Sequence, residues 1–476
     1  MGDKIADYFP MPSYRPKQRE VLEKIWEMFE SGKKLVLLEA PVGFGKSAVN
    51  TALCRYYTPS VYTTPQLSLI DQIRNDKFLG EYFVEIKGRE NYLCPLDNYL
   101  SSVKYGLCRR EKIQCDRFKV CPYYSQKIRA IKSPMVLMST AYYIVDAYLE
   151  PPNFSNRRLV VIDEGHLLSE YVADQVSLEV SEYSLPKPVW KRIKDRLSEP
   201  PDYLLLEEIH NMLTEIFKHY QSVLDSGETL SEEEAVEKEK ATEWVSRYRR
   251  YVETLEQAEW VWCRRPWGWK AEPVYSRWFM KEMVWDRGEM FLVSSATILK
   301  PELWIRENGA DLVYSSDQMV FIRVGSSFPP ENRPVVDLSV GSMRHDHQME
   351  NIDHAVKMLE YIIDRHPNEN IAVHLPSYRL AEEFHKRLKT ERMVWMPMPE
   401  NRDYMLSEWK KKGGVFLAVA YHEGQDWKYD VCTVQVLAKT LYPDTTDQKV
   451  AKRLEKMDYQ WLMWVTLIKC LQAYGR

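Results

Sequence analysis

The sequence lacks any continuous apolar run of the ~18 residues that a membrane-spanning helix needs. It also lacks, at Met1, the basic stretch and apolar segment that mark a secretory signal. These absences predict a soluble protein that makes no membrane contact and works in the cytoplasm, where a prokaryotic or viral context is assumed. A strong charge of one sign is absent as well, because the formal net charge is only -4. Nucleic-acid binding would therefore depend on local basic surfaces.

Closely spaced cysteine pairs are also missing. Four of the eight cysteines fall within 28 residues, with the spacing C-x13-C-x6-C-x5-C. A structural zinc site usually includes a C-x2-4-C knuckle, whereas the larger span of a cubane iron-sulfur cluster tolerates wider spacing. We therefore favour a cluster over zinc or free thiols. The candidate ligands are Cys94, Cys108, Cys115 and Cys121, and the scattered Cys54, Cys263, Cys432 and Cys470 are expected to be buried small hydrophobes.

A chain of 476 residues is too long for one ordinary core, and its length favours about three domains. Short apolar runs, typical of strands buried on both faces of a parallel sheet, alternate with segments of helical length. They cluster before residue 300 and after residue 365, and so predict an α/β fold with two doubly wound lobes. The runs lie at residues 35–38, 61–63, 136–138, 159–162, 291–293, 371–373, 415–419 and 434–437.

Two segments interrupt the first lobe. Residues 88–132 contain the cysteine cluster and carry 10 lysines and arginines against 4 acidic residues. A basic segment in a slightly acidic chain can bind nucleic-acid phosphates, and Arg109 and Arg110 are the candidate contacts. Residues 176–257 have the pattern of helices, with a helix-capping box that begins at Ser231. The pattern predicts one basic and one helical insertion.

Residues 40–47 read Ala-Pro-Val-Gly-Phe-Gly-Lys-Ser and directly follow an apolar run. Gly43 and Gly45 would let backbone amides close around phosphates, and the following helix would present its positive end. Lys46 adds a point charge, and Ser47 is the expected Mg²⁺ ligand in the pattern G-x-x-x-x-G-K-[ST], with alanine replacing the first glycine. The combination favours nucleotide binding over an ordinary strand-to-helix turn.

A second candidate element is the acidic pair that ends the apolar run at residues 159–162. Asp163 and Glu164 would lie at the carboxyl edge of a parallel sheet, where ligands bind. Asp163 would hold Mg²⁺ through water, and Glu164 would polarise the water that attacks the γ-phosphate of ATP. Solvated Asp-Glu pairs are common, but four preceding apolar residues and an upstream phosphate loop favour the catalytic interpretation.

The acidic run resembles the DEAH-type box of superfamily 2 helicases, and the order of motifs along nearly all of the chain resembles the XPD/DinG family of iron-sulfur DNA helicases. In the first lobe, the adenine-reading Q motif is resembled by Tyr14, Arg15, Pro16 and Gln18, and motif Ia, which contacts DNA phosphates, by Thr63, Thr64 and Pro65. The last cluster ligand and its context are resembled by Cys121 to Tyr124, and motif III by Ser295, Ala296 and Thr297. In the second lobe, Ser327, Phe328, Glu331 and Asn332 resemble the leading segment, Ser377 and Tyr378 motif IV, Glu423, Gly424 and Asp426 motif V, and Gln472, Gly475 and Arg476 the start of motif VI.

The resemblance implies two RecA-like lobes with ATP and Mg²⁺ between Lys46 and Arg476, and nucleotide contacts from Gln18, Arg15 and Asp426. It also implies a 4Fe-4S cluster domain that acts as a wedge while single-stranded DNA moves 5′ to 3′ past Thr63, Thr64 and Ser377. The substrate would be a forked or tailed duplex, and the protein a monomer that a larger complex could recruit. The expected boundaries are 1–87, 133–175 and 258–310 for the first lobe, 88–132 for the cluster domain, 176–257 for a helical arch and 311–476 for the second lobe.

Two departures from the family pattern affect this expectation. Glycine replaces the usual alanine of the acidic box, at a position after both acids. Motif VI stops at Arg476 without the family's second arginine, so we expect either a longer molecule or compromised hydrolysis. An accessory DNA-binding subunit or a translocase that does not unwind is therefore the competing hypothesis. Lys46, Asp163, Glu164 and Gln18 are all present and favour the motor.

Overall fold

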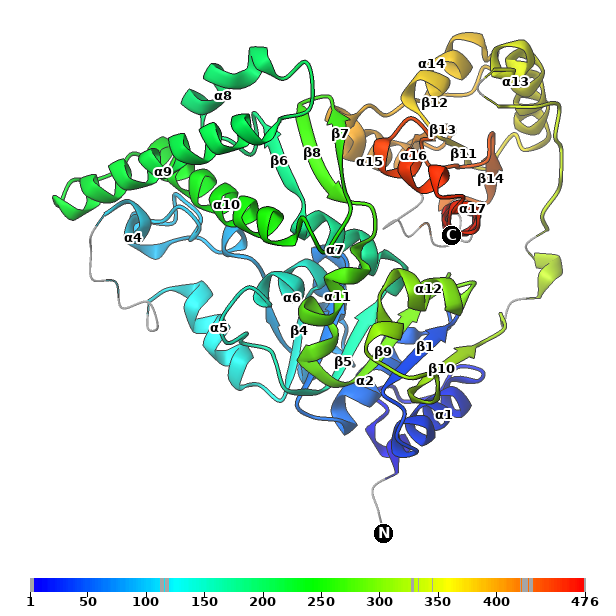
Figure 1. Cartoon of the computed structure of the whole chain (residues 1–476). Coiled ribbons are helices and arrows are strands. Elements are labelled where there is room, and N and C mark those ends of the chain that lie inside the picture. The colour runs from blue at the N-terminus through cyan, green and yellow to red at the C-terminus, as the bar shows by residue number, and fades with distance from the viewer. Residues whose placement is uncertain are drawn as a thin grey trace. The chain divides into compact units, whose positions relative to one another are not determined.

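The structure is a computed structural model that describes residues 4–111, 115, 120–326, 329–332, 334–344, 346–419, 421, 427 and 431–474 (Figure 1). The chain divides into two compact units. The first consists of Met1–Val324 with Thr445–Met457, and the second of Gly325–Asp444 with Asp458–Arg476. Each unit contains its own parallel sheet. The α/β fold with two lobes is thereby confirmed.

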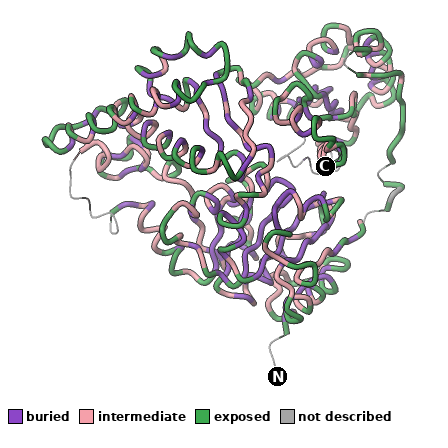
Figure 2. Tube along the Cα trace, in the orientation of Figure 1, coloured by how far each residue is buried: buried purple, intermediate pink, exposed green. Residues whose placement is uncertain are grey.

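The first unit contains a seven-stranded sheet with the strand order β10-β1-β9-β5-β2-β4-β3. All neighbouring strands in it are parallel. Every residue of β1 and β2 is buried, and Figure 2 shows the same for most of the sheet. The strands are β1 (Leu35–Glu39), β2 (Ser60–Thr64), β3 (Val84–Ile86), β4 (Met135–Ser139), β5 (Arg157–Asp163), β9 (Gly288–Ser295) and β10 (Met319–Arg323).

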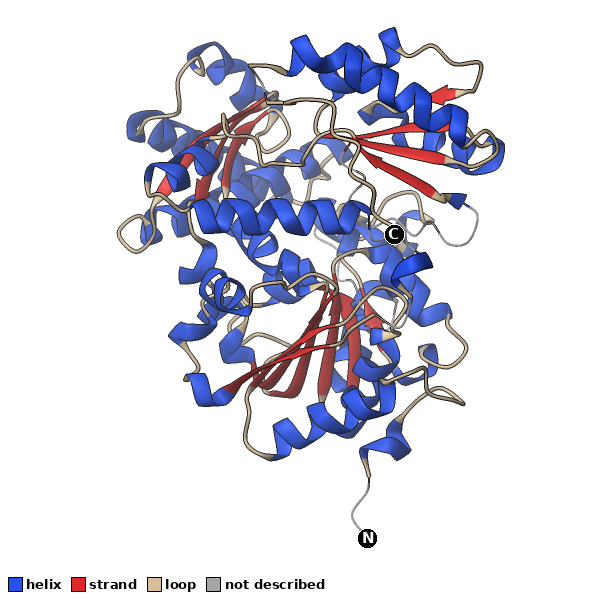
Figure 3. Cartoon of the chain, turned by 90° about the vertical axis from the view of Figure 1, so that its right-hand side faces the viewer, coloured by secondary structure: helices blue, strands red, loops and turns tan. Residues whose placement is uncertain are grey.

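Alternate residues of these strands belong to two hydrophobic layers, because helices cover both faces of the sheet (Figure 3). On one face, Val36 and Leu38 share a core with buried residues of α1 (Gln18–Glu30). On the other, Phe291 packs edge-on against Trp285, with ring centroids 5.0 Å apart. Strands buried on both faces need no polar alternation, which explains the continuous apolar runs. The other helices here are α2 (Lys46–Tyr56), α3 (Leu67–Asn75), α5 (Pro122–Lys132), α6 (Thr140–Asp146), α7 (Leu168–Val176), α11 (Met280–Met283) and α12 (Pro301–Glu307).

The helical insertion has a core and a sheet of its own. The helices are α8 (Lys187–Ile193), α9 (Tyr203–Asp225) and α10 (Glu232–Thr254). The predicted capping box of α10 is present, since Ser231 and Glu234 bond each other's backbone amides. A three-stranded antiparallel sheet, in the order β6-β8-β7, packs on these helices. Its strands are β6 (Leu178–Ser181), β7 (Trp260–Arg265) and β8 (Gly268–Pro273).

The cysteine-containing insertion contacts α10. Its short helix α4 (Leu107–Arg110) follows a Leu93–Ser102 bridge. The amide of Leu230 donates to the carbonyl of Arg110 at 2.8 Å, and Arg89 pairs with Glu239 at 2.8 Å. The basic insertion and the helical insertion are thus joined by backbone and charge contacts. Among the described residues, no helix combines the length and the apolar character that a membrane crossing requires.

The second unit contains a four-stranded parallel sheet in the order β12-β13-β11-β14. The central strands β11 (Ile371–Leu375) and β13 (Val415–Val419) are buried along their whole length, and both lie where the apolar runs predict them. The edge strands are β12 (Val394–Trp395) and β14 (Val434–Leu437), and the helices are α13 (Gln348–Arg365), α14 (Tyr378–Arg387), α15 (Arg402–Lys412) and α17 (Tyr459–Tyr474).

Three features differ from the expected domain limits. Strand β10 pairs with β1, so the first unit extends past the expected limit at residue 310 to Val324. Strand β7 pairs with β8 in the small sheet and does not return to the seven-stranded sheet at residue 258. Helix α16 (Gln448–Glu455) belongs to the first unit, although the residues on either side of Thr445–Met457 belong to the second. Each difference depends on pairing between distant segments, which no local pattern reports.

Candidate functional site

The phosphate loop connects β1 to α2 in the conformation that its glycines permit. Gly43 and Gly45 both have a φ of 84°, in the left-handed region that a side chain disfavours. A Cβ on Gly45 would lie 2.3 Å from Nε2 of Gln18, so the Gln18 side chain would have to move to admit one. Lys46 is the first residue of α2, and its Nζ donates to the carbonyl of Ala40 at 3.2 Å. The positive end of α2 and the lysine therefore belong to one loop, as the motif predicts.

The two polar residues expected to read adenine contact the phosphate loop directly. Gln18 donates from Nε2 to the carbonyls of Phe44 and Gly45, at 2.8 and 3.2 Å. Arg15 donates to the carbonyl of Gly43 at 2.7 Å, and its amide donates to Oε1 of Gln18. These bonds hold the loop from its outer side. The adenine contact stays a prediction, and support of the loop is a second role that the sequence did not suggest.

The acidic pair lies at the end of β5, beside the loop. Asp163 is the last residue of β5, and Glu164 follows with a φ of 49°. Burial raises the pKa of the Asp163 carboxyl, and the Glu164 charge raises it further, whereas Lys46 and the Ser294 hydroxyl act in the opposite direction. The carboxyl group therefore lies within the electrostatic reach of the phosphate-loop lysine. That proximity is what a shared Mg²⁺ and phosphate site needs.

Ser295 links three of the predicted motifs. Its carbonyl accepts the amide of Ala40 from the phosphate loop at 3.0 Å. Its hydroxyl lies 2.8 Å from Nδ1 of His166 and accepts the amide of Thr297 at 3.1 Å. The same imidazole nitrogen lies 3.3 Å from Oε2 of Glu164. A change at the acidic pair can therefore reach motif III through one imidazole ring.

The sequence did not identify the side chains that surround Asp163 and Glu39. Asn50, Tyr62 and Ser294 form a buried hydrogen-bonded group behind Asp163. Only Asn50 carries a recognisable signal, because it lies four residues after Lys46 and so on the same side of α2. Arg323 pairs with Glu39, the residue before the loop, at 2.6 Å. This contact depends on the pairing of β10 with β1, which the sequence does not show.

The predicted DNA contacts have different surroundings. Thr63 and Thr64 at the end of β2 are fully buried, and their hydroxyls donate to the carbonyls of Val161 and Gln66 at 3.2 and 3.1 Å. Ser377 is exposed and caps α14 by accepting the amide of Leu380. Contacts between these residues and DNA phosphates stay predictions. For Thr63 and Thr64, the buried hydroxyls already have protein partners.

The four clustered cysteines lie in one insertion. All eight cysteines of the chain are among the described residues, and none forms a disulfide. Cys94 and Cys121 are buried, whereas Cys108 and Cys115 are half-buried. A Cβ on Gly106 would lie 2.7 Å from Sγ of Cys94, so the glycine leaves room around that thiol. Four thiol donors are the set that an iron-sulfur cluster or zinc uses, but no three of these four described thiols have their sulfur atoms within 4.8 Å of one another, so the cluster stays a prediction.

The two arginines of α4, Arg109 and Arg110, are only partly exposed. Arg110 lies 3.9 Å from Asp97, which is itself buried. Arg109 is half-buried and lowers the pKa of Lys238 on α10, although burial has the larger effect on that lysine. Several other predicted residues, Arg476, Gly475, Asp426, Glu423, Gly424, Ser327 and Phe328, lie outside the described residues.

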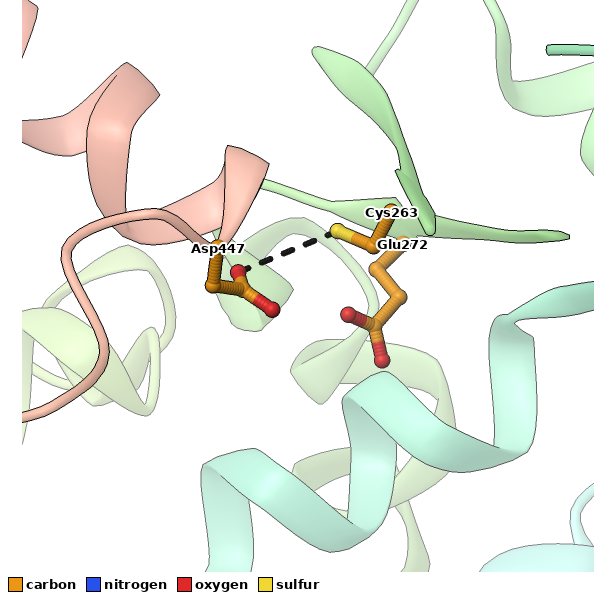
Figure 4. Close-up of side chains that lie close together, drawn as sticks. All are labelled: Cys263, Glu272 and Asp447. Carbon is orange, nitrogen blue, oxygen red and sulfur yellow. Dashed lines mark hydrogen bonds between the residues drawn. The ribbon is translucent and has the colours of Figure 1, made fainter. Parts of the chain in front are cut away.

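A second group of potential metal ligands has a different explanation. Single ligand atoms of Cys263, Glu272 and Asp447 lie within 4.8 Å of one another (Figure 4). Arg265 pairs with both carboxylates, at 2.7 Å each, and Lys270 pairs with Glu272 at 3.0 Å. Burial, and then the two nearby carboxylates, raise the pKa of Cys263 to about 12. The thiol stays protonated at neutral pH and the carboxylates are neutralised by protein cations, so the group does not fit a metal ion.

Comparisons with known proteins agree with this geometry. Residues 359–476 match the family model described as helicase C-terminal domain, and residues 11–207 match that of the type III restriction enzyme res subunit. No curated protein matches the sequence. An XPD helicase structure is 16% identical with a TM-score of 0.65, covering 98% of this chain and 93% of that one. An apo XPD structure (13%, TM-score 0.57, 97% and 92%) and Xpd4 of S. tokodaii (16%, 0.56, 97% and 91%) are also similar.

Proposed function

We propose that this chain, a helicase-type protein with the fold of XPD-like superfamily 2 helicases, is an ATP-dependent DNA helicase. The observation that carries the proposal is the meeting of three motifs at the carboxyl edge of the seven-stranded sheet. The phosphate loop, the acidic pair and motif III are joined there through Ala40, His166 and Ser295. That is the edge at which open α/β sheets bind ligands. The strands of the sheet fix the positions of the three motifs, and the loops that follow the strands carry the proposed reactive residues.

In the proposed reaction, loop amides and Lys46 bind the β- and γ-phosphates of ATP. Ser47 and Asp163 would hold Mg²⁺, which would neutralise charge on the phosphates when bound. Glu164 orients and polarises the attacking water, with His166 close enough to share a proton. Removal of the γ-phosphate would then change the contacts of His166 with Ser295, and Ser295 belongs to motif III. Arg476 is the proposed cation from the second lobe.

The DNA-contacting part of the proposal rests on the basic insertion and its cysteines. Single-stranded DNA would move 5′ to 3′ as the lobes close and reopen, with phosphate contacts from Thr63, Thr64 and Ser377 and from the arginines of α4. A 4Fe-4S cluster held by the four clustered cysteines would supply mechanical stiffness to this insertion. A stiff, basic insertion can hold one strand while the other is displaced. We propose that the protein does this as a monomer on forked or tailed duplexes.

The direct test measures DNA-stimulated ATP hydrolysis beside strand displacement on a duplex with a 5′ single-stranded tail. We expect both activities, and we expect Lys46→Ala to abolish both. A duplex with only a 3′ tail is the matched control and should not be unwound. Stimulation without displacement would make the protein a translocase or an accessory DNA-binding subunit. Absence of stimulated hydrolysis would refute the motor.

The cluster has its own test. Anaerobically purified protein should be brown, absorb visible light through thiolate-to-iron charge transfer, and contain about four irons per chain. Replacing Cys121 with serine should remove the colour, while Cys54→Ser, outside the cluster, should not. Colourless protein that contains zinc would contradict the assignment without affecting the nucleotide site.

A further inference from the structure

Both oxygens of the Asp163 carboxylate are held from behind by hydroxyl groups. Oη of Tyr62, on β2, lies 3.1 Å from Oδ2. Oγ of Ser294, on β9, lies 2.8 Å from Oδ1. A carboxylate can only accept hydrogen bonds, so both hydroxyls must donate their protons to it. The two strands on either side of β5 therefore hold the carboxylate in a fixed plane.

These two bonds determine which of the neighbouring groups donate and which accept. Each hydroxyl has used its single proton and can only accept from its remaining neighbour. That neighbour is Asn50 of α2, whose Nδ2 lies 3.2 Å from Oη of Tyr62 and 3.0 Å from Oγ of Ser294. An amide NH₂ group has two protons, one for each hydroxyl. Its carbonyl oxygen has no partner among the described residues, so the two hydroxyls determine which way the side chain points.

This group excludes water and extends to the phosphate loop. Asn50, Tyr62 and Ser294 are all completely buried, so solvent cannot replace a lost bond. Ser47, in the phosphate loop, lies close enough to the Tyr62 hydroxyl to act on the pKa of Tyr62, which burial and the Asp163 charge raise and Ser47 lowers. The group therefore lies between the Asp163 carboxylate and the phosphate loop.

We propose that Asn50, Tyr62 and Ser294 are positioning residues that orient Asp163 for the Mg²⁺ bound with ATP. This inference rests on the proposed function, which makes Asp163 a metal-binding residue. The three positioning residues would act without contacting the nucleotide, by fixing the plane of the carboxylate. Partners of this kind commonly change metal affinity by about 10- to 100-fold when removed.

The simpler alternative is that the three residues only satisfy one another inside the unit. Such a group would affect stability without affecting the metal. The distinguishing measurement is the Mg²⁺ concentration that gives half-maximal ATP hydrolysis, because stability alone does not change it. Binding of a fluorescent ADP analogue in EDTA reports the phosphate loop without the metal.

Three variants remove the group stepwise. Tyr62→Phe and Ser294→Ala each delete one hydroxyl oxygen, and Asn50→Leu removes the amide that donates to both hydroxyls. We expect each to raise the half-saturating Mg²⁺ concentration by about tenfold or more, with unchanged ADP-analogue binding in EDTA. The matched control is Thr51→Val, since Thr51 is the next residue of α2, is fully buried, and has a hydroxyl without a partner among the described residues. It should leave the Mg²⁺ dependence unchanged.

A combined variant tests whether Asn50 acts through the two hydroxyls. In the Tyr62→Phe/Ser294→Ala background, adding Asn50→Leu should change the Mg²⁺ dependence no further. Wild-type Mg²⁺ dependence in Tyr62→Phe and Ser294→Ala would overturn the proposal, and both are mild enough to keep the protein folded.

Asp163→Asn separates this inference from the proposed function. If that variant keeps normal Mg²⁺-dependent hydrolysis, the metal assignment itself fails. If it loses hydrolysis while the three positioning variants behave as wild type, only the positioning role fails.

Discussion

The buried ion pair between Arg453 and Glu307 should decide whether α16 stays attached to the first unit. The Arg453 side chain is 2% exposed and that of Glu307 is 7% exposed, and the guanidinium also lies over the ring of Tyr275 at 4.5 Å. Replacing Arg453 with methionine removes the buried partner of Glu307 and leaves the more exposed Arg306, 3.9 Å away, beside the buried carboxylate. Removing one member of a buried pair typically costs about 3–5 kcal/mol. A cost of this size is large for a single helix of eight residues.

The measurement is amide hydrogen exchange of α16, because a local opening is expected there before global unfolding. A loss of 3–5 kcal/mol corresponds to exchange faster by roughly two to nearly four orders of magnitude. The control is Lys452→Met on the same helix, whose partner Glu455 is exposed and whose loss should leave exchange unchanged.

A second comparison separates loss of the pair from loss of packing. The double variant Arg453→Met/Glu307→Leu removes both charges and should recover most of the protection, because hydrophobic pairs commonly replace buried ion pairs without loss. Wild-type exchange in Arg453→Met would refute the reasoning. So would a double variant that exchanges faster than the single one.

Three further outcomes follow from the candidate site and from the contacts of α16. Gly45→Ala should lower nucleotide affinity by about tenfold in equilibrium titration, since the left-handed backbone alone costs roughly 1–2 kcal/mol and Gln18 must also move; unchanged affinity would mean that the loop has another conformation. Glu164→Gln should lower kcat about 10²- to 10⁴-fold with little change in nucleotide binding, and a normal kcat would assign the general base elsewhere. Burial alone would raise the pKa of Asp447, but the bond and charge of Arg265 outweigh it and hold the pKa below 3.8. The stabilisation by Asp447 is therefore complete above that pH and is lost as the pH falls through the lower pKa that Asp447 has in the folded protein. Asp447→Asn should remove this acid-induced increase in the hydrogen exchange of α16. An unchanged increase would point to another carboxyl group.

The sequence predicted most strands of the two parallel sheets because their signal is local, but it did not predict β3, β10 or β12. A strand such as β13 is buried on both faces and must be apolar throughout. The phosphate loop is equally local, since strand, glycines, lysine and helix are contiguous. The order of strands is not local, and β10 illustrates this. It is half-buried over most of its length and joins β1 from 284 residues away, so nothing in its own composition names its partner.

The candidate site shows the same division. Lys46, Asp163 and Glu164 could be found because each belongs to a contiguous pattern. Tyr62 could not, although it touches Asp163, because its role comes from β2 lying beside β5. The alternation of Trp260 and Trp262 is typical of a strand, but the partner of β7 is β8, which follows it in a hairpin, and the alternation alone does not distinguish that sheet from the larger one. Contiguous residue patterns identified the chemical groups of the site, but they did not identify the side chains that surround each group in the fold.

The placement of Thr445–Met457 in the first unit has a practical consequence for anyone who divides this protein into fragments. The backbone passes between the two units after Val324, again after Asp444 and a third time after Met457. A cut at residue 324 would therefore not give two self-sufficient pieces. The C-terminal fragment would carry α16 with Asp447 and Arg453 deprived of Arg265 and Glu307. The N-terminal fragment would keep those two partners without the helix, and we expect the two pieces to reassociate through it.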